Sequence, residues 1–270
     1  MPLIHILILA LVQGITEFLP VSSSGHLVLL HSFWEGGAVD LCWEQNRTLD
    51  IGLHVGTLLS VLLYYRRDVV AMIGGLKSPK SDGGQLLKYV FLASLPAVLA
   101  GFMLHKMQPS LLCLIEVMAW MMLVFGIVLW IADRYFTGNK ELSAMGVRDA
   151  FLIGLAQTLA LVPGTSRSGI TMTAGLFLGF SRTESARFSL LLAIVAISGA
   201  GTLGALDLWV SGDLELGMDV LIAVILSFLV GWGAIALMIK WLEKATFTPF
   251  AVYRLIFGTA LLGLVYSGVL

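Results

Sequence analysis

Long apolar stretches are the feature of this sequence that most constrains its fold. Six such runs are nearly free of charged side chains: Leu49–Tyr65, Leu86–Leu104, Leu111–Ala132, Phe188–Leu208, Val220–Ile239 and Phe250–Val269. A helix that crosses a bilayer needs about 20 mostly apolar residues. The runs do not alternate between apolar and polar residues, which excludes an outer-membrane β-barrel. We therefore predict an all-α integral membrane protein with six transmembrane helices.

The composition excludes several other classes of protein. Charged residues make up only 12% of the 270 residues and apolar residues 58%, whereas a soluble domain carries about 25% charged residues. The net charge of −1 excludes a nucleic-acid binder that works through a basic face. The chain has only two cysteines, Cys42 and Cys113, and no C-x-x-C pair. A disulfide scaffold and a cysteine zinc site are therefore excluded as well.

Two further apolar stretches are interrupted by polar turns. Leu3–Trp34 and Phe151–Phe180 each contain a segment rich in serine and glycine between two short apolar helices. Irregular backbone at membrane depth is tolerated only where protein or a water-filled cavity surrounds it. We therefore predict two re-entrant helical hairpins in addition to the six spans.

Basic residues predict the orientation of the chain in the membrane. The segment 66–88 contains five Lys and Arg residues, whereas the segment 207–219 contains four acidic residues and no basic ones. Because cytoplasmic loops carry an excess of Lys and Arg, the first segment is expected inside and the second outside. On this topology the first hairpin enters the membrane from outside and the second from the cytoplasm.

The two hairpins also mark an internal repeat. Gly14–Leu19 aligns with Gly154–Leu159, and Ser22–Gly25 aligns with Ser166–Gly169. We expect a single membrane domain over residues 1–270, built from two halves of opposite orientation at about 1–135 and 149–270. Inverted repeats with broken helices place a binding site near the midplane. The two polar turns are therefore expected to meet there.

Three ionisable residues lie in or beside these turns. Glu17, His26 and Arg167 are costly at membrane depth, and such residues are usually functional. The planar fork of Arg167 suits a phosphate. The turns Ser22–His26 and Pro163–Gly169 add hydroxyls and backbone N–H groups at helix N-termini, which favour an anion. The alternative is a structural ion pair between Glu17 and Arg167 that only locks the hairpins together.

The same residues suit phosphoryl chemistry, which needs positive charge on the phosphate oxygens, a nucleophile and a proton donor. Ser23, His26 or a water activated by Glu17 can supply the nucleophile, and His26 or Glu17 the proton. Gln13 lies one helical turn before Glu17, so the pair can hold a hydrated metal or orient a water. His54 in the first span can face the cavity, but a lone histidine among apolar residues is more often a packing residue, and this is the preferred interpretation.

Three segments resemble a known family. Gln13-Gly-Ile-Thr-Glu17, Phe18-Leu-Pro-Val-Ser-Ser-Ser-Gly-His26 and Pro163-Gly-Thr-Ser-Arg-Ser-Gly-Ile-Thr171 are similar to motifs of the bacitracin-resistance family of undecaprenyl-pyrophosphate phosphatases. The resemblance runs through the whole chain. It departs at Gln13, where the family also uses an acidic residue, and at Val195, where a proline is expected.

The resemblance implies dephosphorylation of undecaprenyl pyrophosphate to undecaprenyl phosphate and inorganic phosphate. This reaction recycles the lipid carrier for cell-wall synthesis in the bacterial cytoplasmic membrane and gives bacitracin resistance. It further implies Glu17, His26 and Arg167 as the essential residues and dependence on Mg²⁺ or Ca²⁺. From its chemistry, Ser23 is expected to be catalytic as well, and Glu17 is expected to hold the metal. Substrate contacts are expected from Gln13, Ser22, Ser24, Gly25, Gly164, Ser166, Ser168, Gly169 and Thr171. The partners expected are this lipid and the membrane, with no nucleic acid and with a homodimer as one option.

The main rival is a transporter, because inverted repeats and broken helices are transporter architecture. A polyprenyl-phosphate flippase or a small-anion transporter would use Glu17 as a proton relay. A reversible binding site needs no nucleophile beside the phosphate, so Ser23 and His26 favour catalysis. The other membrane lipid-phosphatase superfamily is a second rival, but this chain lacks its later His-x-x-x-Asp segment.

Overall fold

The computed structural model describes residues 2–35, 48–107, 114–211 and 214–268, and within them the regular elements are helices. The α-helices are α1 (Leu3–Thr16), α2 (Ser23–Glu35), α3 (Thr48–Tyr64), α4 (Arg66–Gly75), α5 (Asp82–Met107), α6 (Ile115–Tyr135), α7 (Val147–Thr158), α8 (Arg167–Phe177), α9 (Arg182–Ser211), α10 (Leu214–Leu242) and α11 (Thr248–Tyr266). Two short 3₁₀ helices, η2 (Leu142–Ala144) and η3 (Leu159–Leu161), flank α7.

Each of the six predicted spans overlaps one helix, namely α3, α5, α6, α9, α10 or α11. Within the described residues four stretches are long and apolar enough to cross a membrane: Asp82–Leu104, Ile115–Tyr135, Leu216–Leu242 and Thr248–Tyr266. Helix α3 is a shorter apolar helix of 17 residues. The chain is thus an all-helical membrane protein, and the total of six spans stays a prediction. Leu111, Cys42 and Cys113 lie outside the described residues.

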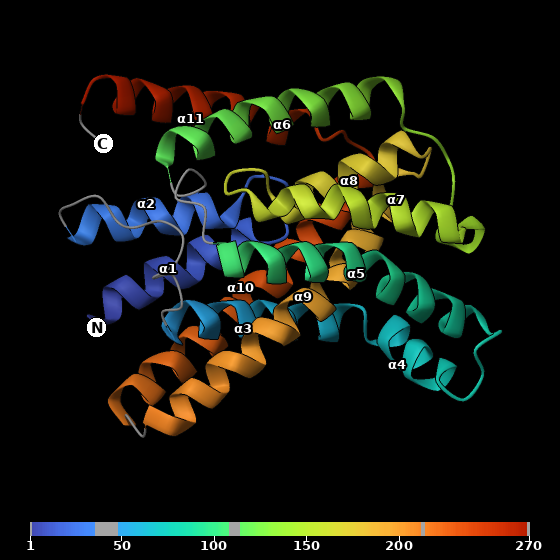
Figure 1. The fold of residues 1–270 in the computed structure, drawn as a ribbon, viewed down its shortest axis with the longest axis horizontal. Coiled ribbons are helices and arrows are strands. Elements are labelled where there is room, and N and C mark those ends of the chain that lie inside the picture. Colours follow the sequence, from blue (N-terminus) through green and yellow to red (C-terminus); the bar gives the residue numbers. More distant parts are fainter. Residues whose placement is uncertain (1, 36–47, 108–113, 212–213, 269–270) are drawn as a thin grey trace.

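Both interrupted stretches form helical hairpins. Helices α1 and α2 are joined by the turn at 17–22, and α7 with η3 is joined to α8 by the turn at 162–166. In Figure 1 the two hairpins approach the centre of the molecule from opposite ends, with α6 and α11 along one side and α3, α9 and α10 on the other. The site is therefore built where the two turns meet.

A glycine allows each hairpin to lie against a long helix. A Cβ on Gly14 of α1 would come within 2.8 Å of Val230 side-chain atoms on α10. A Cβ on Gly154 of α7 would come within 2.6 Å of the Ala93 carbonyl oxygen on α5. Contacts this close exclude any larger side chain. Because Gly14 and Gly154 align in the sequence repeat, each hairpin packs in the same way against the other half of the chain.

The segment 66–88 was predicted as a loop, and here the structure differs. It contains α4, which runs antiparallel to the start of α5 and packs on it. An ion pair between Asp68 of α4 and Arg187 of α9 fixes this helix to the bundle. Basic residues gave the segment the appearance of a loop, although a short helix that is charged on its outer face has the same composition.

Candidate active site

The two turns share one unusual backbone conformation. Ser22 and Ser166 are the only described residues other than glycine with positive φ, at 71° and 72°. Such a conformation costs about 1–3 kcal/mol and persists where the surroundings enforce it. In each turn the serine hydroxyl lies near that of the serine two residues later, 3.3 Å for Ser22 and Ser24 and 3.2 Å for Ser166 and Ser168. The repeat seen in the sequence is therefore also a repeat of local geometry.

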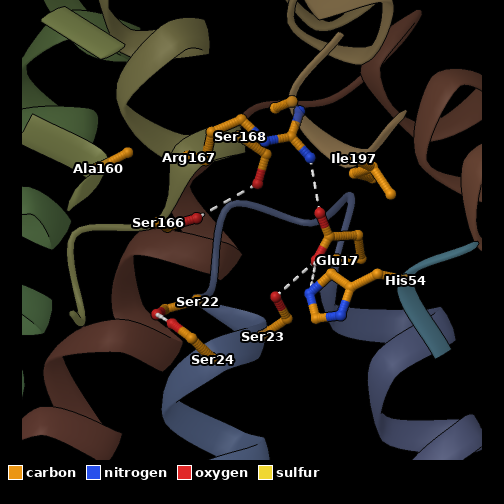
Figure 2. Close-up of a pocket in the computed structure, with 11 residues that line it drawn as sticks. Glu17, Ser22, Ser23, Ser24, His54, Ala160, Ser166, Arg167, Ser168 and Ile197 are labelled. Carbon is orange, nitrogen blue, oxygen red and sulfur yellow. Dashed lines mark hydrogen bonds and ion pairs between the residues drawn. The ribbon is translucent and has the colours of Figure 1, made fainter. Parts of the chain in front are cut away.

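An ion pair joins the two turns. Arg167, the first residue of α8, donates from Nη2 to Glu17 Oε1 at 2.6 Å. Glu17 lies directly after α1 and is only 8% exposed. Arg167 also donates from Nη1 to the Ser189 carbonyl at 3.2 Å, which orients its guanidinium. Figure 2 shows the arginine and the glutamate pointing toward each other across the pocket.

Ser23 lies on the other side of the same carboxylate. Its hydroxyl donates to Glu17 Oε2 at 2.7 Å (Figure 2), and Ser23 is the first residue of α2. Gln13 Nε2 donates to the same oxygen at 3.1 Å from one turn back along α1. A serine hydroxyl that donates to a carboxylate at this distance meets the geometric requirement for a nucleophile beside its base.

Glu17, Ser23 and Arg167 line a cavity of about 260 Å³. Its walls come from both turns and from α3, η3 and α9: Glu17, Ser22, Ser23, Ser24, His54, Ala160, Ser166, Arg167, Ser168, Ala196 and Ile197. The helices α2 and α8 both begin at a residue of this wall, so their unpaired N–H groups and positive dipole ends lie beside it. One guanidinium, two helix N-termini and five serine hydroxyls suit a phosphorylated ligand. The five serines are Ser22, Ser23, Ser24, Ser166 and Ser168.

His54, for which packing was the preferred interpretation, takes the alternative position and lines this cavity. Its Nε2 lies 3.7 Å from Glu17 Oε2, and its Nδ1 donates to the Asp50 carbonyl at 2.8 Å. Figure 2 shows the imidazole beside the carboxylate. The sequence held one signal for this position, because Asp50, His54 and Thr57 recur at helical spacing on one face of α3.

His26 does not line the cavity, although it was expected among the catalytic residues. Its Nδ1 donates to the Ser22 carbonyl at 2.8 Å, and its Nε2 lies 2.5 Å from the Tyr253 hydroxyl. The ring stacks on Phe257 and Tyr253 of α11. Both ring nitrogens are thus engaged, and the contacts fix the first turn against α11.

Three glycines that were predicted as substrate contacts, Gly25, Gly164 and Gly169, do not line the cavity but support the two turns behind it. Gly164 has φ +88°, and a Cβ there would come within 2.1 Å of the Met118 carbonyl oxygen, so only glycine fits. Gly169 donates its N–H to Ser166 Oγ at 3.1 Å, which caps α8. Gly25 lies against Met118, since a Cβ there would be 3.3 Å from the sulfur.

Thr171 also lies behind the cavity. Its hydroxyl donates to the Arg167 carbonyl at 2.8 Å and lies 2.7 Å from the Ser189 hydroxyl. Ser168 donates to the Leu19 carbonyl at 3.0 Å, which ties the second turn to the first. These hydroxyls position the backbone around Arg167.

Arg254 of α11 is the largest fully buried side chain among the described residues, with 0% exposure. Its guanidinium donates to the Pro20 carbonyl in the first turn at 3.3 Å and to the Gly164 carbonyl in the second at 2.9 Å. It also donates to the carbonyls of Met121 and Met122 at 3.2 Å each. A single side chain of α11 therefore holds both turns and α6 together.

The donors present fit a divalent cation that shares its ligands with a substrate. Within the described residues no three His, Cys, Asp or Glu side chains cluster as a metal site on their own. Gln13 Oε1, however, is buried without a hydrogen-bond partner in the described chain, one turn from the Glu17 carboxylate. Mg²⁺ and Ca²⁺ favour such oxygen ligands, and Mg²⁺ commonly takes one or two carboxylates together with substrate phosphates.

Comparison with known proteins shows the family to which this chain belongs. The sequence signature of the family described as "Bacitracin resistance protein BacA" matches residues 6–260. The chain belongs to this family. It is 45% identical over 273 residues to "Undecaprenyl-diphosphatase 1" of Rhodospirillum rubrum, covering 99% of this chain and 97% of that protein. It is 42% identical over 273 residues to "Undecaprenyl-diphosphatase" of Ruegeria pomeroyi, covering 99% and 100%.

A third relative, "Undecaprenyl-diphosphatase" of Alcanivorax borkumensis, is 45% identical over 263 residues, with 95% of this chain and 96% of that protein covered. The resemblance inferred from the three segments is thereby confirmed over nearly the full length. In this member of the BacA family, the motif residues Glu17, Ser23 and Arg167 meet at one cavity.

Proposed function

We propose that this chain is an undecaprenyl-diphosphatase, which hydrolyses undecaprenyl diphosphate to undecaprenyl phosphate and inorganic phosphate. Its membership of the BacA family and the names of its relatives supply the substrate. The single observation that carries the chemistry is the arrangement of Ser23, Glu17 and Arg167. The serine lies 2.7 Å from one oxygen of the carboxylate and the guanidinium 2.6 Å from the other.

Substrate binding is assigned to the positive groups of the two turns. Arg167 and the N-termini of α2 and α8 neutralise the charge on the oxygens of the terminal phosphate. The carboxylate of Glu17 fixes the guanidinium and at the same time accepts the Ser23 proton, so that nucleophile and cation are held on opposite sides of one group. Ser22, Ser24 and Ser166 add hydroxyl groups around the diphosphate, whereas the Ser168 hydroxyl already donates to the Leu19 carbonyl.

In the first chemical step Ser23 Oγ attacks the terminal phosphorus and Glu17 takes the hydroxyl proton. The bond between this phosphorus and the bridging oxygen breaks, and undecaprenyl phosphate leaves with the bridging oxygen, which receives the proton. In the second step a water attacks the phosphoserine and gives its proton to Glu17. Inorganic phosphate leaves, and Ser23 regains its hydroxyl proton.

Glu17 and Gln13 are the residues that would hold Mg²⁺ or Ca²⁺ together with diphosphate oxygens. The cation would add charge stabilisation to the transferring phosphoryl group. Because Gln13 is neutral, this site supplies one carboxylate only. The cation is therefore expected to bind more tightly with substrate than without it.

We place the protein in the bacterial cytoplasmic membrane, with six transmembrane helices and two re-entrant hairpins in an inverted repeat. The matched φ angles of Ser22 and Ser166 and the matched packing of Gly14 and Gly154 support the repeat. The Lys and Arg distribution supports a pocket that opens to the outer face. A cysteine placed at Ser24 should then react with an impermeant thiol reagent added outside, and reaction only from inside would contradict this orientation.

Phosphate release from undecaprenyl diphosphate by the purified protein tests the function. We expect turnover by the wild type with Mg²⁺ or Ca²⁺ and loss in Glu17→Gln and in Arg167→Ala. Both variants should remain monodisperse and keep their helical circular dichroism. Tight lipid retention by well-folded wild-type protein without phosphate release would instead support the flippase or transporter alternative.

A further inference from the structure

A cavity behind the first hairpin is separate from the pocket that holds Glu17 and Ser23. It has a volume of about 490 Å³ and lies between α1, α10 and α11, with Ile15, Ala234 and Phe250 among its lining residues. None of the residues that line it lines the pocket at Glu17. The phosphate chemistry proposed above therefore leaves this cavity without a role.

The cavity is an apolar groove that follows α10. Its lining consists of apolar side chains and one glycine. Leu229, Leu237 and Trp241 in its wall are 56%, 71% and 46% exposed. They belong to the candidate membrane span Leu216–Leu242. Because lipid tails are as apolar as these side chains, the groove is open to acyl chains in a bilayer.

The length of the groove matches one leaflet of the membrane. On α10 it extends from Leu229 to Trp241, and this part of the helix rises by about 18 Å at about 1.5 Å per residue. Half of the hydrocarbon core of a bilayer is about 15 Å thick. A phospholipid acyl chain fills one leaflet, whereas an undecaprenyl chain is far longer. The groove therefore fits an acyl chain better than the prenyl chain.

Two lysines lie at the Trp241 end of the groove. Lys240 follows Leu237 by three positions and Lys244 follows Trp241 by three, so both lie on the groove side of α10. Both are exposed, and within the described residues neither forms an ion pair. Glu243 is the one acidic residue between them, so this end keeps a net positive charge. A tryptophan beside lysines is typical of the membrane interface, where basic residues attract anionic headgroups.

The inner end of the groove lies behind the first turn. Ile15 and Leu19 line it, and Glu17 lies between them in the sequence. The Leu19 carbonyl accepts a hydrogen bond from the Ser168 hydroxyl of the second turn at 3.0 Å. An apolar chain packed against Leu19 therefore supports this contact between the turns from the side away from the phosphate pocket.

We propose that this groove binds an acyl chain of an anionic phospholipid, that the headgroup phosphate lies at Lys240 and Lys244, and that the bound lipid stabilises the first turn. The apolar wall, the length of one leaflet and the positive end all fit this ligand. A second copy of the chain fits less well, because a two-fold axis normal to the membrane would bring the same lysines face to face. The inference concerns lipid binding and does not depend on the reaction proposed above.

A substitution at Gly233 tests the groove. A Cβ at Gly233 would have no heavy atom within 4 Å, so Gly233→Leu adds bulk to the groove without displacing packed atoms. Gly263→Leu on α11 is the matched control, because Gly263 has the same open space and does not line the groove. Both variants are expected to fold, since leucine favours a helix over glycine.

The charged end is tested by the double variant Lys240→Gln/Lys244→Gln. Its control is Lys77→Gln/Lys80→Gln, which removes the same charge from the segment between α4 and α5. Native mass spectrometry of the full-length proteins gives the oligomeric state and the dissociation constant of the first bound lipid. The probes are phosphatidylglycerol, phosphatidylcholine and undecaprenyl phosphate. Hydrogen exchange at residues 17–22 is measured with and without phosphatidylglycerol.

We expect the wild type and both controls to bind phosphatidylglycerol at least about fivefold more tightly than phosphatidylcholine, because one lysine near an anionic group contributes about that factor. The double lysine variant should bind the two phospholipids alike. Gly233→Leu should weaken phosphatidylglycerol binding about tenfold or more, since loss of contact with two buried methylene groups gives that factor. Phosphatidylglycerol should slow hydrogen exchange at residues 17–22 in the wild type and leave it unchanged in Gly233→Leu.

Equal phosphatidylglycerol affinity in Gly233→Leu and Gly263→Leu overturns the proposal, and so do equal affinities of the wild type for the two phospholipids. Loss of undecaprenyl phosphate binding alone in Gly233→Leu would assign the groove to the prenyl lipid instead. A dimer that Gly233→Leu dissociates would assign it to a second copy of the chain. Hydrogen exchange at residues 17–22 that does not respond to bound phosphatidylglycerol would contradict the stabilisation of the first turn.

Discussion

The two hairpin turns share one backbone conformation, the positive φ of Ser22 and Ser166, but carry different chemistry. Ser23 in the first turn occupies the position that Arg167 occupies in the second, and Glu17 occupies that of Gln157. The first turn therefore supplies a hydroxyl and a carboxylate, and the second supplies a cation. The repeated backbone gives two strained turns with helix N-termini behind them, and the site is complete only when both halves of the chain contribute.

The surroundings of the paired positions differ as strongly as the residues themselves. The Glu17 carboxylate accepts hydrogen bonds from the side chains of Arg167, Ser23 and Gln13. Gln157 is 4% exposed and donates to the backbone of α5. One position of the repeat has thus become part of a reactive centre, while its counterpart holds two helices together.

Substitution at these paired positions should give the largest difference in activity. We expect Glu17→Gln to lower kcat by about 10³-fold or more, because the base for Ser23 and the partner of Arg167 are both lost. Gln157→Ala should lower kcat by less than about tenfold and mainly reduce the thermal stability. Steady-state phosphate release and melting temperatures in one detergent compare the two. Equal losses in kcat would show that the halves are not chemically distinct.

The second turn can be tested by changing the shape of its cation while keeping the charge. Arg167→Lys should lower kcat/KM by about 10²-fold, because a lysine cannot contact Glu17 and Ser189 and still present two donors to a phosphate. Rescue of Arg167→Ala by added guanidinium would confirm that geometry as well as charge is required. Near-normal kcat/KM in Arg167→Lys would reduce the role of the second turn to electrostatic attraction.

Arg254 donates hydrogen bonds to both turns, so its loss should affect the stability of both. Arg254→Met removes the donors to the carbonyls of Pro20 and Gly164, and we expect a loss of about 2–4 kcal/mol in the free energy of unfolding. The activity should fall about tenfold at temperatures where the variant is folded. Hydrogen exchange should show faster exchange in both turns. Faster exchange in one turn alone would contradict the inference that Arg254 stabilises both turns.

His26 should show the smallest effect of the residues expected to be catalytic. His26→Phe keeps an aromatic ring against Phe257 and Tyr253, so we expect kcat to fall by less than about tenfold, with a lower melting temperature. His26→Ala, which also removes the stack, is the matched variant and should be less stable. A loss in His26→Phe as large as in Glu17→Gln would show that His26 enters the cavity during turnover.

Sequence reasoning located the parts of the site that depend on local pattern. Apolar run length gave the long helices, and Ser/Gly-rich interruptions gave both hairpins. The prediction that Glu17 and Arg167 lie together rested on the repeat and the charge topology, and the structure places them 2.6 Å apart. Each of these inferences uses residues close in sequence or a period that the chain repeats.

Contacts between distant segments could not be predicted in this way. His26 meets Tyr253 and Arg254 meets Pro20 across more than 220 residues, and no local pattern encodes such a pair. His54 resembled a packing residue because its chain neighbours are apolar, while its position beside Glu17 depends on how α3 packs against the first hairpin. The roles of these three side chains therefore emerged only from the fold.

The central claim is that Ser23 of the first hairpin attacks the phosphorus, with Glu17 as its base. It is tested most directly by rapid acid quenching of the enzyme during turnover of undecaprenyl diphosphate labelled in its terminal phosphate. We expect an acid-stable phosphorylated species whose label maps to Ser23 and is absent in Ser23→Ala. Full turnover by Ser23→Ala, or acid-labile label on His26, would contradict attack by Ser23 with Glu17 as its base.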